Sequence, residues 1–190
     1  MFKKYLQHFT TTDLVIIALL SAGGIATKPF VRVLAQVFTG SLVPIGTVAG
    51  IFYMLWIVLA CIIVNKRGTA ILVGIVQSVL VIVFDMLGNR GLANLLVYVV
   101  PGITLELVMF LFPRYVSSFV SSFMAGGVAN ATGSFIVSWV FMRLAPVPLI
   151  GAVAVSYLFG GIGGVIAFKL YDVIKGFRPG QAEQKSRKSL

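Results

Sequence analysis

The chain has 190 residues, of which 59% are hydrophobic and only 11% are charged, and its mean hydropathy is +1.05. A soluble domain carries about 25% charged residues, so this composition excludes an ordinary water-soluble fold and predicts a protein embedded in lipid. The basic residues behind the net charge of +10 lie at the ends of apolar runs and in the C-terminal tail. They form no basic face with interleaved aromatic residues, so nucleic acid is not an expected partner.

Apolar runs long enough to cross a membrane follow one another along the chain. A spanning helix needs about 20 apolar residues, and six runs reach or approach that length: roughly 13–27, 46–65, 68–87, 92–112, 117–142 and 149–174. The stretch 28–44 contains Pro29, Gly40 and Pro44. It is interpreted as a long, partly helical outer loop, with a seventh, tilted helix as the alternative. The expected fold class is an all-α membrane protein, a bundle of six transmembrane helices.

The basic residues also predict the orientation of this bundle. Of the 15 Lys and Arg residues, four fall on one side of the predicted helices and the other 11 on the opposite side; the four are Lys28, Arg32, Arg90 and Arg143. The side richer in positive charge faces the cytoplasm, so both termini are predicted to be cytoplasmic. Residues 1–176 are expected to form one transmembrane domain, followed by a polar, disordered cytoplasmic tail over 177–190.

Motifs for catalysis and nucleotide hydrolysis are missing from the sequence. No Gly-rich phosphate loop ending in Lys-Ser or Lys-Thr is present, and the Gly-rich run 160–164 lies inside an apolar helix, where it predicts close helix packing. His8 is the only histidine and Cys61 the only cysteine, which excludes a His-based metal site and an intrachain disulfide. The chain is therefore predicted not to be an enzyme and to use neither a cofactor nor a metal.

A stripe of alanines marks the first predicted helix. Ala18, Ala22 and Ala26 recur every four residues, so they lie on one face of that helix. Inside lipid, helices associate through close backbone approach, which small residues permit. The stripe either packs against a neighbouring helix of the same bundle or forms a docking face for another membrane protein.

The chain resembles the substrate-binding (S) components of energy-coupling-factor (ECF) transporters. The resemblance lies in the alanine stripe, the chain length, the number of predicted helices and the predicted cytoplasmic location of both termini. The resemblance implies that Ala18, Ala22 and Ala26 dock onto a transmembrane coupling subunit (EcfT-like), which a pair of separate ATPase subunits drives. It further implies a capture subunit of a vitamin importer in the inner (plasma) membrane of a prokaryote. The alternative from another class is a self-sufficient permease or a channel-like oligomer for a small solute.

Short segments between about residues 46 and 130 are similar to the YkoE-type S components, which are linked to thiamine and its pyrimidine precursor. These segments are Lys66-Arg67-Gly68, Leu87-Gly88-Asn89 with Gly91, Gly102 followed by Glu106-Leu107, and Met124-Ala125-Gly126. Two features depart from that pattern: Tyr53 stands where a tryptophan is expected, and the loop at Arg90 is one residue shorter. The resemblance implies thiamine, its hydroxymethylpyrimidine precursor or a related small vitamin as the ligand.

Polar and aromatic residues in and near the predicted helices are the candidate ligand contacts. Glu106 lies toward the cytoplasmic end of the fourth helix, where a bare carboxylate is costly. It therefore either meets a cationic ligand, or pairs with Arg114, or caps a helix end. The other candidates are residues at an outer helix junction, aromatic residues that can stack on a planar ring, and mid-span amides: Asp85, Asn89, Arg90, Asn94, Tyr53, Trp56, Tyr98, Trp139, Gln77 and Asn130. The structural alternatives for these groups are a solvated turn, anchoring at the membrane interface, and hydrogen bonds between helices.

Overall fold

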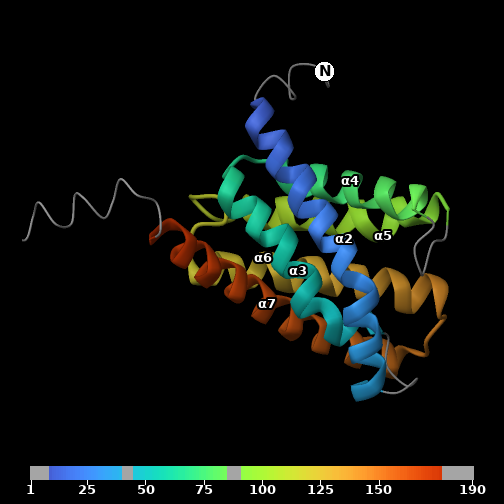
Figure 1. Ribbon diagram of the computed structural model, residues 1–190. Coiled ribbons are helices and arrows are strands. Elements are labelled where there is room, and N and C mark those ends of the chain that lie inside the picture. The colour runs from blue at the N-terminus through green and yellow to red at the C-terminus, as the bar shows by residue number, and fades with distance from the viewer. Residues whose placement is uncertain (1–8, 40–44, 85–90, 177–190) are drawn as a thin grey trace, which may run out of the picture.

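The computed structural model describes residues 9–39, 45–84 and 91–176, and these residues are almost entirely helical (Figure 1). The helices are α2 (Thr11–Thr39), α3 (Ile45–Val64), α4 (Thr69–Val83), α5 (Ala93–Met109), α6 (Phe119–Ile136) and α7 (Pro146–Gly176), and a π-helical segment, η1 (Val137–Phe141), continues α6. No strand occurs in the described ranges, which confirms the all-α fold class.

Four described helices are candidate membrane spans by their length and composition. Four stretches are long and apolar enough to cross a membrane, namely Thr11–Leu34, Thr47–Val64, Phe119–Phe141 and Pro146–Lys175. Helices α4 and α5 are apolar but shorter. The chain is therefore a multi-pass membrane protein, and a count of six spans stays a prediction.

Helix α2 is longer than the sequence predicted. It continues without interruption to Thr39, with Pro29 inside it, so the expected outer loop beginning at residue 28 is wrong as far as residue 39; residues 40–44 lie outside the described part. A proline removes one helix hydrogen bond but is tolerated in membrane helices when nearby groups compensate. The Thr27 hydroxyl donates to the carbonyls of Gly23 and Gly24, each at 3.1 Å, whereas the carbonyl that loses its helix donor to Pro29 is that of Ile25.

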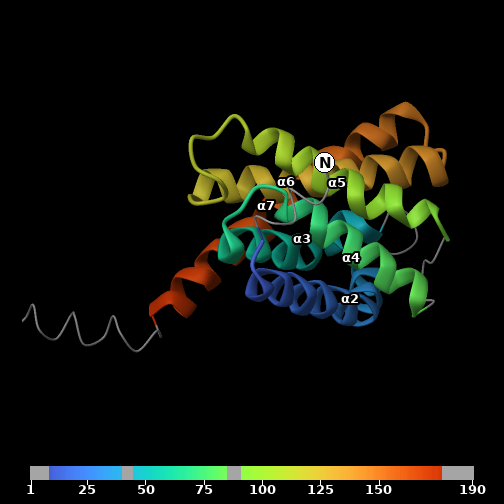
Figure 2. The ribbon, with the colours of Figure 1, turned by 90° about the horizontal axis from the view of Figure 1, so that it is seen from above.

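Helix α3 occupies the centre of the bundle and packs against α2, α4, α6 and α7. Helix α2 packs mainly against α3 and α4. It lies along one edge of the bundle in Figure 2 and crosses in front of the other helices in Figure 1. One long face of α2 is therefore left without a neighbour from the described part of the chain.

Glycines bring α7 close to its neighbours, as the run at 160–164 predicted. A Cβ atom added at Gly160 would collide with the backbone of Gly126 in α6, and one added at Gly164 would collide with the backbone of Ser122. Gly163 faces the backbone of Ile51 in α3 in the same way. The prediction of close packing is confirmed, because the positions of α3, α6 and α7 depend on these missing side chains.

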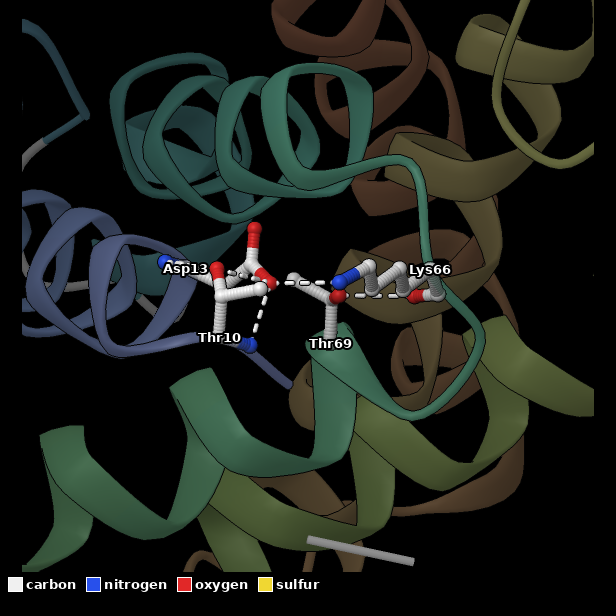
Figure 3. A network of polar contacts seen from close by, with 4 residues as sticks. All are labelled: Thr10, Asp13, Lys66 and Thr69. Carbon is white, nitrogen blue, oxygen red and sulfur yellow. Dashed lines mark hydrogen bonds and ion pairs between the residues drawn. The ribbon is translucent and has the colours of Figure 1, made fainter. Parts of the chain in front are cut away.

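A polar network fixes one end of the bundle (Figure 3). Asp13, in the first turn of α2, accepts hydrogen bonds from the backbone N–H and hydroxyl of Thr10 at 2.7 and 2.8 Å and from Lys66 Nζ at 2.6 Å. The Thr69 hydroxyl donates to the Lys66 carbonyl at 2.6 Å. The start of α2 is thereby joined to the connection between α3 and α4.

The two described ends of the chain lie at this same end of the bundle. Tyr115, in the connection between α5 and α6, packs there in an apolar core with Ile17 and Val64, and Phe168 and Tyr171 of α7 pack against that core. The start of α2 and the end of α7 therefore lie at the same end of the bundle. The compartment that this side faces stays a prediction, and the predicted tail 177–190 lies outside the described residues.

The interior differs in character between the two ends. Apolar residues dominate the core at the end just described, and four buried polar residues lie beside that core: Thr69, Glu106, Ser121 and Ser122. The opposite half buries eight polar residues: Thr47, Gln77, Ser78, Asn94, Asn130, Ser134, Ser138 and Ser156. Polar groups are costly to bury in a membrane protein and mark ligand pathways or helix contacts, so the polar half is where a ligand site is expected.

Candidate functional site

The clearest polar group in this half is a lysine held between two tyrosines. Lys28 of α2 donates to the Tyr98 hydroxyl of α5 at 2.6 Å. Its Nζ lies 3.8 Å from the centroid of the Tyr98 ring and 5.1 Å from that of Tyr53 in α3. A cation within about 6 Å of an aromatic ring is attracted by the ring's negative face. Three helices thus meet around one partly buried ammonium group.

The candidates Trp56 of α3 and Gln77 of α4 pack against α2 about one helical turn before Lys28. A Cβ atom added at Gly24 would lie 2.8 Å from Gln77 Nε2 in α4 and 3.2 Å from Trp56 Cβ in α3. Gly23 faces the ring of Trp56, with Cζ3 at 3.0 Å from such an added atom. The two glycines therefore make the space that the Trp56 and Gln77 side chains fill. We call Lys28, Tyr53, Trp56, Gln77 and Tyr98 the aromatic–lysine cluster.

Asn94 extends the cluster toward the end of the bundle. It lies four residues before Tyr98 in α5, hence on the same helix face, and it is only 2% exposed. The neighbouring candidates Asp85, Asn89 and Arg90 lie outside the described residues, and their part in the site stays a prediction.

Glu106 is placed at the opposite end of the bundle, away from this cluster. Its Oε1 accepts hydrogen bonds from the Ala70 backbone N–H, at 3.1 Å, and from the Tyr115 hydroxyl, at 2.6 Å. Ala70 lies in the first turn of α4, whose N–H groups have no partner within the helix. Burial raises the pKa of the Tyr115 hydroxyl, which keeps the proton that it donates. Of the three alternatives given for Glu106, capping of a helix end describes this geometry. Arg114, the partner in another alternative, is exposed.

Asn130 and Trp139 also lie apart from the aromatic–lysine cluster. The Asn130 side chain donates to the carbonyl of Ser156 in α7 at 2.8 Å and to that of Thr47 in α3 at 3.4 Å. Trp139 is 57% exposed and packs on Phe135, with ring centroids 5.1 Å apart. These contacts match the structural alternatives, a hydrogen bond between helices and an aromatic anchor at the interface.

The alanine stripe faces outward. Ala18, Ala22 and Ala26 are all exposed, while Ile17 and Ser21 on the opposite side of α2 are 1% and 0% exposed. The interpretation that the stripe packs against another helix of the same bundle is therefore wrong. The exposed face is apolar along its length, and its middle is made of small side chains.

Lys28 is not among the site residues predicted from the sequence. The expected end of the first helix at residue 27 placed it in a loop, where a lysine is unremarkable. The sequence nevertheless contains a signal for Lys28, because an ionisable residue inside a membrane helix marks a functional site by default. The continuation of α2 through Pro29 was the information that was missing.

Comparisons with known proteins identify the family of this helical bundle. Residues 12–133, more than half of the chain, match the family model described as "ABC-type cobalt transport system, permease component". The chain belongs to this family. A permease component of a transport system is not an enzyme, which agrees with the prediction from the missing catalytic motifs.

The fold of this permease component is also found in a solved structure, described as "Crystal structure of an S-component of ECF transporter". The two superpose with a TM-score of 0.71 over 95% of this chain and 96% of that chain, at 18% sequence identity. The comparison with curated proteins gave no match. The family and the fold together confirm the resemblance to ECF S components, whereas the YkoE-type subdivision stays a prediction.

Proposed function

We propose that this protein is the substrate-capture subunit of an ECF-type importer in the inner membrane of a prokaryote. The observation that carries the proposal is the outward orientation of Ala18, Ala22 and Ala26 on a helix at the edge of an S-component fold. Small side chains let a second membrane helix approach the α2 backbone closely. The occupant of this face is a transmembrane coupling subunit, itself driven by a pair of ATPase subunits.

The test is co-assembly with the coupling and ATPase subunits, followed by ligand uptake. Replacing all three alanines by leucine should abolish both, because each leucine adds bulk where the partner backbone must approach. Ala154 is an exposed alanine on α7, so Ala154→Leu is the matched control and should leave assembly intact. Assembly and uptake that survive the triple replacement would refute the docking surface.

For the ligand, we propose a small vitamin bound at the aromatic–lysine cluster, with thiamine or its hydroxymethylpyrimidine precursor as the first candidates. Planar heteroaromatic rings stack on aromatic side chains, and the cluster offers three such side chains beside the Gln77 amide. Mass spectrometry of small molecules retained by the detergent-purified protein tests this directly. Ligands of this class should be recovered, and their affinity should fall when the cluster is mutated.

The family description mentions cobalt, so Co²⁺ is the second cargo to test. In the described part of the chain, no three His, Cys, Asp or Glu side chains are grouped to hold a metal ion. A Co²⁺ titration beside the vitamin titrations separates the two cargoes. Solute flux in liposomes that contain this chain alone would instead support a self-sufficient permease and would contradict the capture-subunit proposal.

A further inference from the structure

Arg67 is an exposed arginine that stacks on an aromatic ring at one end of the bundle. It belongs to the short connection between α3 and α4, and its guanidinium carbon lies 4.4 Å from the centroid of the Phe110 ring, at the end of α5. Phe110 is itself 66% exposed. A guanidinium within about 6 Å of an aromatic ring is attracted by the face of that ring, so Phe110 helps to hold an exposed positive charge in one place.

The backbone on either side of this arginine is also held. The Lys66 carbonyl accepts a hydrogen bond from the Thr69 hydroxyl at 2.6 Å, and Gly68 has a φ of 93°, which favours glycine. The Glu106 carboxylate of α5 accepts a hydrogen bond from the Ala70 backbone N–H of α4 at 3.1 Å. This bond sets the start of α4 against the end of α5, which is the register that the contact between the arginine and the ring requires.

No carboxylate in the described part of the chain neutralises Arg67. The carboxylates of that part belong to Asp13, Glu106 and Asp172, and the only ion pair within it joins Asp13 to Lys66. A guanidinium carries five N–H donors and binds phosphate oxygens through two parallel hydrogen bonds. The donors of Arg67 are therefore available to an anion from outside this part of the chain.

An exposed apolar face of α5 leads away from Phe110. Ile103 and Leu107 precede Phe110 by seven and three residues, hence on the same helix face, and are 39% and 60% exposed. Leu111, the next residue after Phe110, is 81% exposed. In a membrane protein such a face is covered by lipid acyl chains, and a lipid headgroup at its end meets Arg67.

We infer that Arg67 and Phe110 form a binding site for an anionic phospholipid, whose phosphate is held by Arg67 and whose acyl chains lie along Ile103 and Leu107. The charges are complementary, because the headgroup is negative and Arg67 is positive without a counterion in the described ranges. An arginine near a membrane surface contributes about fivefold to the binding of an anionic lipid. The site uses neither the alanine stripe nor the aromatic–lysine cluster, so the inference is independent of the proposed function.

Native mass spectrometry of the detergent-purified chain, titrated with phosphatidylglycerol or with phosphatidylcholine, tests the inference. The wild type should bind phosphatidylglycerol about fivefold more tightly than phosphatidylcholine, and Arg67→Gln should lose this preference. Phe110→Leu keeps an apolar side chain but removes the ring, so it should reduce the preference. Arg114→Gln is the matched control and should keep it, because Arg114 is an exposed arginine of the neighbouring connection between α5 and α6.

An equal preference in the wild type and in Arg67→Gln would overturn the inference. Equal losses in Arg67→Gln and Arg114→Gln would also overturn it, because they would indicate general attraction to a basic surface. Soluble glycerol 3-phosphate has no acyl chains and should not displace phosphatidylglycerol; displacement at equal concentration would indicate a site for free phosphate instead. If Arg67→Gln does not fold, Phe110→Leu decides, and an unreduced preference in that variant overturns the inference. A retained lipid preference together with lost assembly in Arg67→Gln would assign the anion to a protein partner.

Discussion

Lys66 Nζ lies 2.6 Å from Asp13 Oδ2, and this ion pair joins the first turn of α2 to the connection between α3 and α4. Helix α2 carries both the exposed alanine stripe and Lys28, yet it packs mainly against two neighbours. Its position therefore depends on its packing against these two helices and on this polar anchor. The proposed docking through Ala18, Ala22 and Ala26 requires that α2 is held at a defined angle.

The first prediction concerns this anchor. Lys66→Met should lower the stability by about 1 kcal/mol, because the pair is partly exposed, at 26% for Lys66 and 14% for Asp13. Asp13→Ala should cost more, since Asp13 also accepts two hydrogen bonds from Thr10. Thermal unfolding in detergent of both variants and of the double variant gives the coupling energy. Strictly additive effects would show that the pair contributes nothing.

The second prediction separates a structural role of Glu106 from ligand binding. Glu106→Ala leaves the Ala70 N–H and the Tyr115 hydroxyl without their acceptor, which should lower stability by about 1–3 kcal/mol. Tyr115→Phe removes one of the two hydrogen bonds and should have a smaller effect. Ligand affinity, measured on the folded fraction below the thermal midpoint, should stay near the wild-type value in both variants. A large loss of affinity in Glu106→Ala with unchanged stability would assign the carboxylate to the ligand instead.

The third prediction tests the glycine contacts between α6 and α7. Gly160→Ala places a methyl group against the backbone of Gly126 and should destabilise the fold by about 1–3 kcal/mol. Gly151→Ala is the matched control on the same helix, because nothing lies within 4 Å of the added Cβ there. That control should be neutral or slightly stabilising, since alanine favours helix more than glycine does. Equal effects in thermal melts would contradict the packing argument.

The fourth prediction distinguishes site aromatics from anchoring aromatics. Tyr53→Leu should weaken vitamin binding about tenfold, because it removes a ring from the cluster around Lys28. Trp139→Leu removes a larger but peripheral ring and should leave the affinity within about twofold of wild type. Calorimetric titration of both variants provides the measurement. The opposite ranking would move the ligand site to η1, around Trp139.

The sequence by itself determined that the protein is embedded in lipid and that its fold is a bundle of helices. Composition and hydropathy are properties of the chain alone, so the membrane class, the positions of the helices apart from the C-terminal end of α2, and the tight packing at 160–164 could be predicted. The spacing of Ala18, Ala22 and Ala26 also fixed that they share one face. A helix has the same periodicity wherever it packs, so periodicity could not say whether that face lies inside or outside the bundle.

The tertiary structure decided which side chains meet. Lys28 became a candidate site residue only because the structure places it inside α2 and beside Tyr98, which lies 70 positions away in the sequence. The sequence position of Glu106 showed that its carboxylate is costly inside a membrane helix. It could not show the partner of that carboxylate, because the Ala70 backbone N–H belongs to a different helix. Such pairings depend on how helices are arranged around α3, and that arrangement follows from contacts distant in the sequence rather than from local pattern.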